Sequence, residues 1–236
     1  MSIVPDDTGD SSTGGLFEDD IIAAILAAVS EQRLPAGTKL GEQALSDLFG
    51  CNRANVRRAL AALAAQHVVE LRPNRGAFIA TPSPQEAREV FEARRAVECM
   101  LAKHAVERVR PEEIAHMRSM IHEEAQARQR GDRPAELRFS RAFHMQLATV
   151  AGNRILERFL ADLTLRTTLI LGLYSTEGSS DCAEDEHVAI VDALEARDAP
   201  RLISLLEEHL RHLEAKLEFD RTPRGPLTLA EQLMRN

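Results

Sequence analysis

The sequence has few of the residues that build disulfide frameworks, aromatic cores and membrane spans. Its 236 residues include no tryptophan, one tyrosine and three widely spaced cysteines, Cys51, Cys99 and Cys182. No CxxC pair is present, which argues against a disulfide framework and against a thiolate zinc site. No apolar run reaches the length of a membrane span, and the first residues are too acidic and polar for a signal peptide. These absences lead us to expect a reduced, cytoplasmic protein.

Basic residues are outnumbered by acidic ones, except in one segment. The sequence has 29 lysines and arginines against 37 acids, which gives a formal net charge of −8. That balance excludes histone-like coating of nucleic acid, so any contact with DNA has to be made by a local patch. Between Cys51 and Ala80 the balance reverses, because five arginines accompany a single acid, Glu70. This segment is therefore the candidate for a nucleic-acid contact.

The first eighty residues have the pattern of a winged helix-turn-helix. Apolar periodicity and turn residues predict helices over 17–31, 41–49 and 53–66 and strands over 68–71 and 77–80. Gly50 is suited to end the second helix, and Asn52 is suited to cap the third. Pro73 and Gly76 lie in the turn between the two strands, which would form the wing.

The remainder of the sequence predicts helices alone, because Ala, Leu, Glu and Arg dominate it. Prolines and glycines divide it into helices over 84–108, 111–130, 133–151, 153–175, 184–197 and 199–219. The predicted fold class is mainly α, an N-terminal winged helix-turn-helix (three helices plus a β-hairpin wing) followed by an all-α bundle of six to seven helices. The predicted divisions are a disordered tail (1–15), the DNA-binding domain (16–80), a linker (81–84), an effector-binding domain (85–220) and a C-terminal tail without an assigned role (221–236).

The arginines of the basic segment predict a DNA-reading tip. The second helix of a helix-turn-helix enters the major groove with its N-terminal residues nearest the bases, and Arg53 and Arg57 share one face there. A guanidinium can bind guanine bidentately or clamp a phosphate. A plain solvated helix face is the competing interpretation, which the wing and the turn make less favourable. The predicted DNA contacts are Arg53, Ala54, Asn55, Arg57, Arg58, Arg72, Arg75 and Gly76.

The stretch "LGEQALSDLFGCNRANVRRALAALAAQHVVELRPNRGAFIA" resembles the DNA-binding domain of the GntR family of bacterial transcription regulators. The family pattern is matched by Glu42, Leu45, Arg53, Val56, Arg57, Ala59, Leu60, Arg75 and Gly76. Two departures stand out. Cys51–Asn52 replaces the usual Val-Ser/Thr, and Arg58 replaces the usual Glu, which makes the patch more basic. The second departure could alter the preference for an operator sequence.

The helical half, with "FEARRAVE" and "FHMQLATVAGN", looks like the ligand-binding domain of the FadR-like branch of that family, so the resemblance covers about residues 17–219. The resemblance implies a helical bundle around a divalent metal, bound by one Asp and three His, with a small carboxylate effector nearby. This sequence has Ser140 where the family's Asp belongs. Three readings stay open: a three-His site completed by water or an effector carboxylate, a weakened site, or no metal site.

Three histidines support a metal site independently of the resemblance. His144, His187 and His209 lie on the apolar faces of three different predicted helices. One inward histidine is more often a hydrogen-bonded core residue than a ligand, but three that can converge favour Zn, Ni or a similar ion. His212 lies at the edge of its apolar stripe and is expected to face solvent or another side chain.

Two arginines on apolar helix faces, Arg94 and Arg166, support an anionic ligand. A buried arginine is costly unless it is paired. The plain explanation is internal pairing, for instance of Arg94 with Glu98 one turn on. The sharper hypothesis is that Arg94 and Arg166 receive the carboxylate of an effector beside the histidines and Ser140.

The combined features predict a homodimeric transcription regulator, a repressor that binds a pseudo-palindromic operator in double-stranded DNA and responds to a small organic acid. We expect no enzymatic activity. The alternative is a metal-dependent hydrolytic enzyme with a three-His site. Against it, the only acids that the sequence suggests near the histidines are Glu184, Asp185 and Glu186, and none is well placed as a general base.

Overall fold

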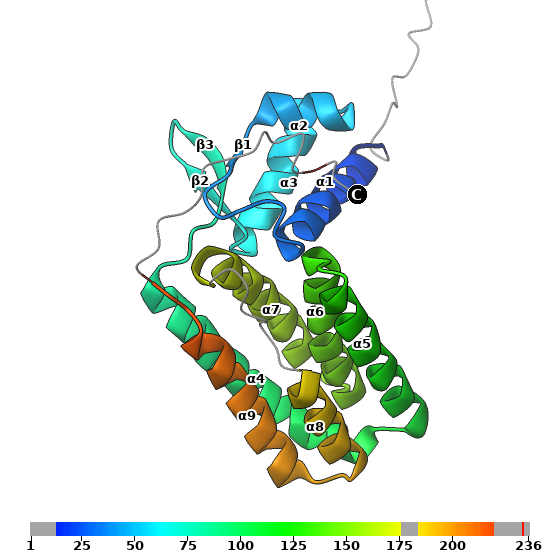
Figure 1. Cartoon of the computed structure of the whole chain (residues 1–236). Helices are drawn as coiled ribbons and strands as arrows, with labels where there is room; N and C mark the ends of the chain where they lie inside the picture. The colour runs from blue at the N-terminus through cyan, green and yellow to red at the C-terminus, as the bar shows by residue number, and fades with distance from the viewer. Residues whose placement is uncertain (1–12, 176–183, 220–232, 234–236) are drawn as a thin grey trace, which may run out of the picture.

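The computed structural model describes residues 13–175, 184–219 and 233 (Figure 1). Most of the two predicted tails, the loop before Glu184 and Cys182 lie outside these residues. Within the described part of the chain, nine helices and three short strands form a small N-terminal unit and a larger helical unit. Residues 13–80 are called the head below, and residues 84–219 the body.

The head is the predicted winged helix-turn-helix with one additional strand. Its elements are α1 (Thr13–Ser30), β1 (Lys39–Leu40), α2 (Glu42–Phe49), α3 (Arg53–Ala65), β2 (Val69–Arg72) and β3 (Gly76–Ile79). The strands form an antiparallel sheet in the order β1-β3-β2, in which Leu40 is opposite Ala77 and Val69 is opposite Ile79. The fold class is therefore confirmed, and β1 is an element that the sequence did not predict.

Local signals fix the turn between α2 and α3 as the sequence predicts. Gly50 ends α2 with a φ of 60°, a left-handed conformation that costs little only for a residue without a Cβ. The side chain of Asn52 accepts a hydrogen bond from the backbone N–H of Asn55 at 2.9 Å and so caps α3. The two signals together set the direction in which the N-terminus of α3 leaves the head.

The body consists of α4 (Pro84–Arg108), α5 (Pro111–Gln129), α6 (Arg133–Ala151), α7 (Arg154–Tyr174), α8 (Glu184–Glu195) and α9 (Ala199–Ala215). Each helix begins within one residue of its predicted start. A capping box joins the head to α4, since Ser83 accepts from the N–H of Glu86 at 3.2 Å and Glu86 accepts from the N–H of Ser83 at 2.8 Å. The body core includes fully buried Leu101, Met117 and Phe143, each of which contributes about 1.5–3 kcal/mol by burial.

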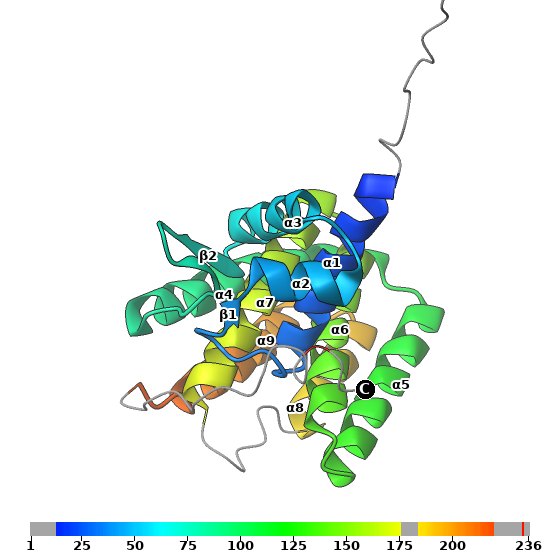
Figure 2. The ribbon, with the colours of Figure 1, turned by 90° about the horizontal axis from the view of Figure 1, so that it is seen from above.

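The head and the body share part of one core. Leu165 and Leu169 of α7 are buried in the same apolar cluster as Ile21 and Ile25 of α1. Figure 1 shows α1 above the ends of α6 and α7, and Figure 2, seen from above, shows the head lying over the body. Apolar side chains of the head and of α7 thus belong to one core cluster.

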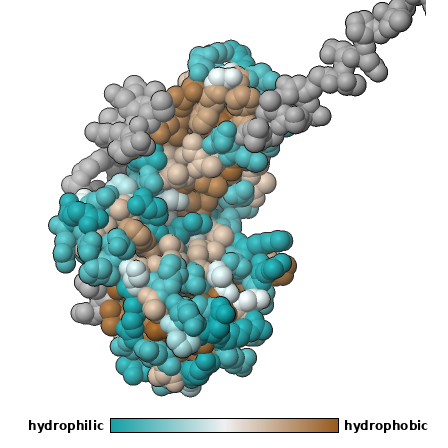
Figure 3. All heavy atoms as spheres, turned by 90° about the vertical axis from the view of Figure 1, so that its right-hand side faces the viewer, coloured by the Kyte–Doolittle hydropathy of each residue, from teal (hydrophilic) through white to brown (hydrophobic). Residues whose placement is uncertain are grey.

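Close packing and one ion pair complete this junction. A Cβ built on Gly172 of α7 would lie 3.3 Å from the Nε2 atom of Gln32, which follows α1. Arg138 of α6 lies 3.6 Å from Glu31. On the face shown in Figure 3, apolar residues gather over the head and its junction with the body, and the lower body is mostly hydrophilic. Among the described residues, no helix is long and apolar enough to cross a membrane.

Candidate metal centre and DNA-reading surface

The N-terminus of α3 exposes most of the residues predicted to contact DNA. Arg53, Ala54, Arg57 and Arg58 are exposed. Asn55 differs, because it is only 4% exposed and its side-chain oxygen accepts a hydrogen bond from Arg58 at 2.7 Å. In this structure Asn55 therefore belongs to the interior of the head and not to the surface that a DNA duplex could touch.

Each arginine of this surface already has an acceptor within the head. Arg53 donates to Gln43 from Nε at 2.8 Å, and Arg57 forms an ion pair with Glu42 at 2.8 Å. Ion pairs this exposed contribute about 0–1 kcal/mol, so phosphates can replace the protein acceptors at low cost. Arg58 forms an ion pair with Glu18 of α1 at 3.0 Å, so the arginine that departs from the family pattern links α3 to α1.

The wing carries two arginines, Arg72 and Arg75, whose surroundings differ. Arg72 lies 4.5 Å from the ring centroid of Phe78 and 2.8 Å from Glu70. Burial raises the pKa of Glu70, but hydrogen bonds from the Thr81 backbone and from Arg72 outweigh it, so that the pKa is lowered overall. Arg75 is exposed at the turn, next to Gly76 with a φ of 93°. Arg75 is thus the wing arginine better placed to reach DNA.

The three predicted histidine ligands meet inside the body. His144 of α6, His187 of α8 and His209 of α9 are all buried. Each can offer one ring nitrogen such that the three nitrogens lie within 4.8 Å of one another. The ring centroids are 5.4 Å apart for His144 and His187, and 4.9 Å apart for His187 and His209. Three helices distant in sequence thus bring three imidazoles to one point.

Every imidazole of the cluster has a carboxylate on its Nδ1 atom. The distances are 2.8 Å from His144 to Glu98, 2.8 Å from His187 to Glu124 and 2.8 Å from His209 to Glu186. A carboxylate on Nδ1 selects the tautomer whose proton is on Nδ1 and whose lone pair is on Nε2, the arrangement of metal-binding histidines. The Nε2 atom of His144 is buried and has no hydrogen-bond partner among the residues that the structure describes.

The protonation states suit metal binding. Burial lowers the pKa of His144 to about 3, so its imidazole is neutral. Burial raises the pKa of Glu98, but the charge of Arg94 and the hydrogen bonds from His144 and Arg94 outweigh it and lower the pKa overall. For Glu186 the burial effect is outweighed by hydrogen bonds from His209 and His212, and its pKa falls to about 2. His144 is therefore a neutral nitrogen donor in front of the ionised carboxylate of Glu98.

Two of these carboxylates correct the sequence analysis, which placed only residues 184–186 near the histidines. Glu98 and Glu124 are buried against the cluster, from α4 and α5. Glu186 is the member of the predicted acidic run that contacts a histidine, and the side chains of Glu184 and Asp185 lie outside the described residues. The spacing of Glu124 from Met117 and Ile121, on the buried face of one helix, is a signal that could have identified it.

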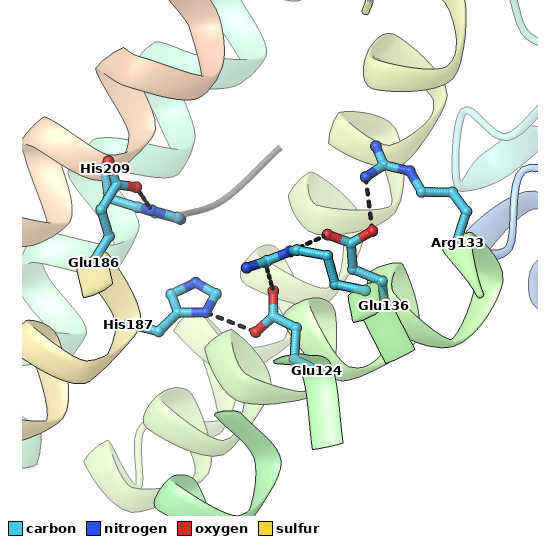
Figure 4. A network of polar contacts seen from close by, with 7 residues as sticks. Glu124, Arg133, Glu136, Glu186, His187 and His209 are labelled. Carbon is cyan, nitrogen blue, oxygen red and sulfur yellow. Dashed lines mark hydrogen bonds and ion pairs between the residues drawn. The ribbon is translucent and has the colours of Figure 1, made fainter. Parts of the chain in front are cut away.

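A chain of polar contacts leads away from His187. Figure 4 shows the carboxylate of Glu124 pointing toward His187. On its other side, the Nη2 atom of Arg128 lies 3.5 Å from Glu124. Arg128 donates to Glu136 of α6 at 2.8 Å, and Arg133 donates to the second oxygen of Glu136 at 3.1 Å. Charged groups of alternating sign thus connect the cluster to the first turn of α6.

The predicted effector residues separate in the structure. Arg94 is buried and pairs with Glu98 at 2.6 Å, so the predicted internal pairing is confirmed. Ser140 is partly buried one turn before His144 on α6. Arg166 lies 4.0 Å from Asp162. Hydrogen bonds with Ser83 lower the pKa of Glu86, and the charge of Arg166 lowers it further. Those neighbours place Arg166 beside the first turn of α4, about 12 Å along that helix from Arg94.

His212 lies at the rim of the cluster. Its side chain is exposed, and its Nδ1 atom is 2.7 Å from Glu186, as expected for a histidine that faces solvent and another side chain. Glu98, Glu124 and Glu186 are each engaged with an imidazole Nδ1. Within the described part of the chain, these three carboxylates are therefore placed to orient histidines and not to activate water as a general base.

Both the head and the body match families of known proteins. Residues 17–79 match the family described as "Bacterial regulatory proteins, gntR family", and residues 89–212 match the FCD domain. The sequence is 28% identical over 193 residues to the HTH-type transcriptional regulator BphR of Paraburkholderia xenovorans, which covers 78% of each chain. It is 22% identical over 178 residues to the HTH-type transcriptional repressor RspR of Escherichia coli, covering 75% of this chain and 78% of that one.

The fold has a similar counterpart among solved structures. McbR/YncC of Escherichia coli superimposes with a TM-score of 0.74 and 19% sequence identity, and the match covers 84% of this chain and 95% of that chain. At this identity the likeness concerns the fold alone. It extends over the head and the body, so the same arrangement of two units also occurs in another protein.

Proposed function

Because the chain belongs to the GntR family of bacterial regulatory proteins and its body is an FCD domain, we propose that it is a repressor controlled by a small carboxylate bound beside a divalent metal. The protein is a transcription regulator, and the relatives named above are regulators and not enzymes. The sign of regulation rests on the relative named as a repressor. The relatives named above give the hydrolytic alternative no support.

The observation that carries the metal part of the proposal is the pairing of three buried imidazoles with three carboxylates. Their donor atoms fit Zn²⁺ or Ni²⁺, because neutral imidazole nitrogens suit both ions and carboxylates on Nδ1 raise ligand basicity. His144, His187 and His209 would hold the ion. When bound, the ion supplies a Lewis-acidic position for a carboxylate oxygen of the effector. Ser140, one turn from His144, would line the same position.

A route from this site to the head supports control of DNA binding. His144 and Arg138 lie on the same helix, and Arg138 contacts Glu31 just after α1. Near the other end of α1, Glu18 forms the ion pair with Arg58 of the recognition helix α3. A ligand that shifts α6 would therefore act on α1 and on the recognition helix. The size of the effect is limited by the difference in ligand affinity between the two states.

We further propose a homodimer that presents two recognition helices to the half-sites of a pseudo-palindromic operator. Large apolar side chains on the body surface support an intersubunit contact. Ile155 and Phe159, one turn apart on α7, are exposed, and so is Met100 of α4. Arg53, Arg57 and Arg75 would then contact DNA at each half-site.

The metal is tested with two alanine variants on one helix. His209→Ala and His212→Ala each remove an imidazole that binds Glu186, but only His209 belongs to the cluster. Chelator-treated protein is titrated with Zn²⁺ against a fluorescent indicator. We expect one equivalent of zinc in the wild type and in His212→Ala, and loss of that equivalent in His209→Ala. Equal zinc binding by both variants would remove the metal from the proposal.

Regulation is tested with DNA from the region upstream of the gene. Footprinting with zinc-loaded protein should give a symmetric protected site. Small carboxylates are then added, and the operator Kd is measured by fluorescence anisotropy at fixed salt, since phosphate contacts make the affinity salt-dependent. An operator Kd that no carboxylate changes would refute effector control while leaving DNA binding established.

A further inference from the structure

Arg141, on α6 directly after Ser140, is a charged side chain that the sequence analysis did not single out. Its Nε atom is buried without a hydrogen-bond partner, and among the described residues no acid forms an ion pair with it. Burial and the nearby charge of Arg94 lower its pKa. Arg141 and His144 are three residues apart on one helix, so Arg141 lies next to the histidine cluster.

Arg94 approaches the same place from α4. It is 4% exposed, and its Nε atom donates to the Oε1 atom of Glu98 at 2.6 Å. The other oxygen of Glu98 is 2.8 Å from His144. The structure gives the two terminal nitrogens of Arg94 no acceptor among the described residues. A single carboxylate is thus shared by one guanidinium and one imidazole, and the second guanidinium has none.

The charges of Arg94, Arg141 and Glu98 add up to a positive value. Arg94 and Arg141 contribute two positive charges, and Glu98 contributes one negative charge. Leaving a charge buried without a partner is strongly unfavourable. A solvated arginine on the same helix looks different: the side chain of Arg138 is 56% exposed and lies 3.6 Å from Glu31. Arg141 is partly buried and its Nε atom is fully buried without a hydrogen-bond partner among the described residues, which favours a binding role over that of a surface residue.

We infer that Arg94 and Arg141 form an anion subsite beside the histidine cluster and that the effector is a dianion, either a dicarboxylate or a small phosphate ester. This inference rests on the proposed effector function and gives its ligand class. One anionic group would lie between the two guanidiniums, which offer the fork of N–H donors that carboxylate and phosphate oxygens accept. The second would lie at the three histidines, where a divalent ion would add two further positive charges. A monoanion would satisfy only one of the two positions.

The test compares dianions with monoanions of the same carbon number on zinc-loaded, full-length protein. The pairs are succinate with butyrate, glutarate with valerate, and glycerol 3-phosphate with glycerate. Binding is measured by calorimetry and by the shift of the thermal midpoint. We expect at least one dianion to bind at least about tenfold more tightly than its matched monoanion. The phosphate pair shows whether a phosphate group can supply the negative charge in place of a second carboxylate.

Two glutamine variants on α6 complete the test. Arg141→Gln should bring the dianion affinity down to that of the matched monoanion, whereas Arg138→Gln should leave the ratio unchanged. Equal affinities within every pair, or an unchanged ratio in Arg141→Gln, would overturn the inference. If monoanions bind and alter operator affinity, the proposed function survives that result. If zinc fails to bind but dianions still bind through Arg141, the inference survives and the metal does not.

Discussion

Replacing Glu98 by glutamine is the sharpest perturbation of the body core. Glu98 is 0% exposed, accepts from Arg94 at 2.6 Å and contacts His144 at 2.8 Å. Glutamine keeps the shape but removes the charge, and its NH₂ group then opposes one of two N–H donors. Breaking a buried ion pair from one side costs about 3–5 kcal/mol. At about 2–4 °C per kcal/mol for a chain of this size, the Tm should fall by about 6–20 °C.

The assay uses the scarcity of aromatic residues. The sequence has no tryptophan, and its one tyrosine, Tyr174, is buried in the body, so tyrosine fluorescence reports unfolding of the body beside circular dichroism. Glu92→Gln, an exposed position on the same helix, is the control. The free energy of unfolding is taken from urea titrations at pH 7. A loss below about 1 kcal/mol, no larger than that of the control, would refute the assigned role of Glu98.

The pH dependence of this variant follows from the direction of the pKa shift. The pKa of Glu98 in the folded protein lies below its ordinary value of 4.5. The ionised carboxylate therefore stabilises the fold above the unfolded pKa, and this contribution is lost as the pH falls through the lower, folded pKa. The stability difference between wild type and Glu98→Gln should be full at pH 7 and should shrink as the pH falls below about 4.5. A difference that grows on acidification would contradict the reasoning.

Three further predictions concern the head, the junction and a thiol. Arg57→Ala should reduce the slope of log K against log salt for the operator by about 1, and an unchanged slope would exclude a phosphate contact there. Leu169→Ala removes a side chain buried in the shared core and should cost about 2–5 kcal/mol in urea titrations, so a loss under 1 kcal/mol would speak against a packed junction. Burial and Glu207 raise the pKa of Cys99 from 9.0 to about 11, so alkylation at pH 8 should be about 100-fold slower than for an ordinary thiol. Glu207→Gln should speed it, and a rate independent of Glu207 would contradict this cause.

The sequence predicted the helices well where local chemistry decides their ends. Pro111 lies at the start of α5, and Gly152, with a φ of 68°, ends α6. Single residues therefore determine these helix ends. The start of α1 was placed later than Thr13 because Gly14 and Gly15 have low helix propensity. The strand β1 was missed because its two residues are stabilised by pairing with β3, about 37 residues away, and such pairing leaves no local pattern.

The same distinction applies to the candidate metal centre. Each of the three histidines could be assigned to an apolar helix face, so their convergence was a reasonable inference. The contact of Glu98 with His144 joins residues 46 apart, and that of Glu124 with His187 joins residues 63 apart. Periodicity gives the face on which a side chain lies but not the partner opposite. The burial of Asn55 was not foreseen either, although its contact with Arg58 joins residues only three apart.

The presence of Leu165 and Leu169 in the core of the head has a practical consequence for building hybrid regulators. The segment around Ser83 looks like the natural point at which to graft a foreign sensor onto this DNA-binding unit. A graft made there would remove two apolar side chains from the interior of the transplanted unit and expose their neighbours to water. A working hybrid would have to carry matching residues from this α7 with it, together with a small residue where Gly172 approaches Gln32. Exchangeable parts in this protein are therefore not contiguous stretches of sequence.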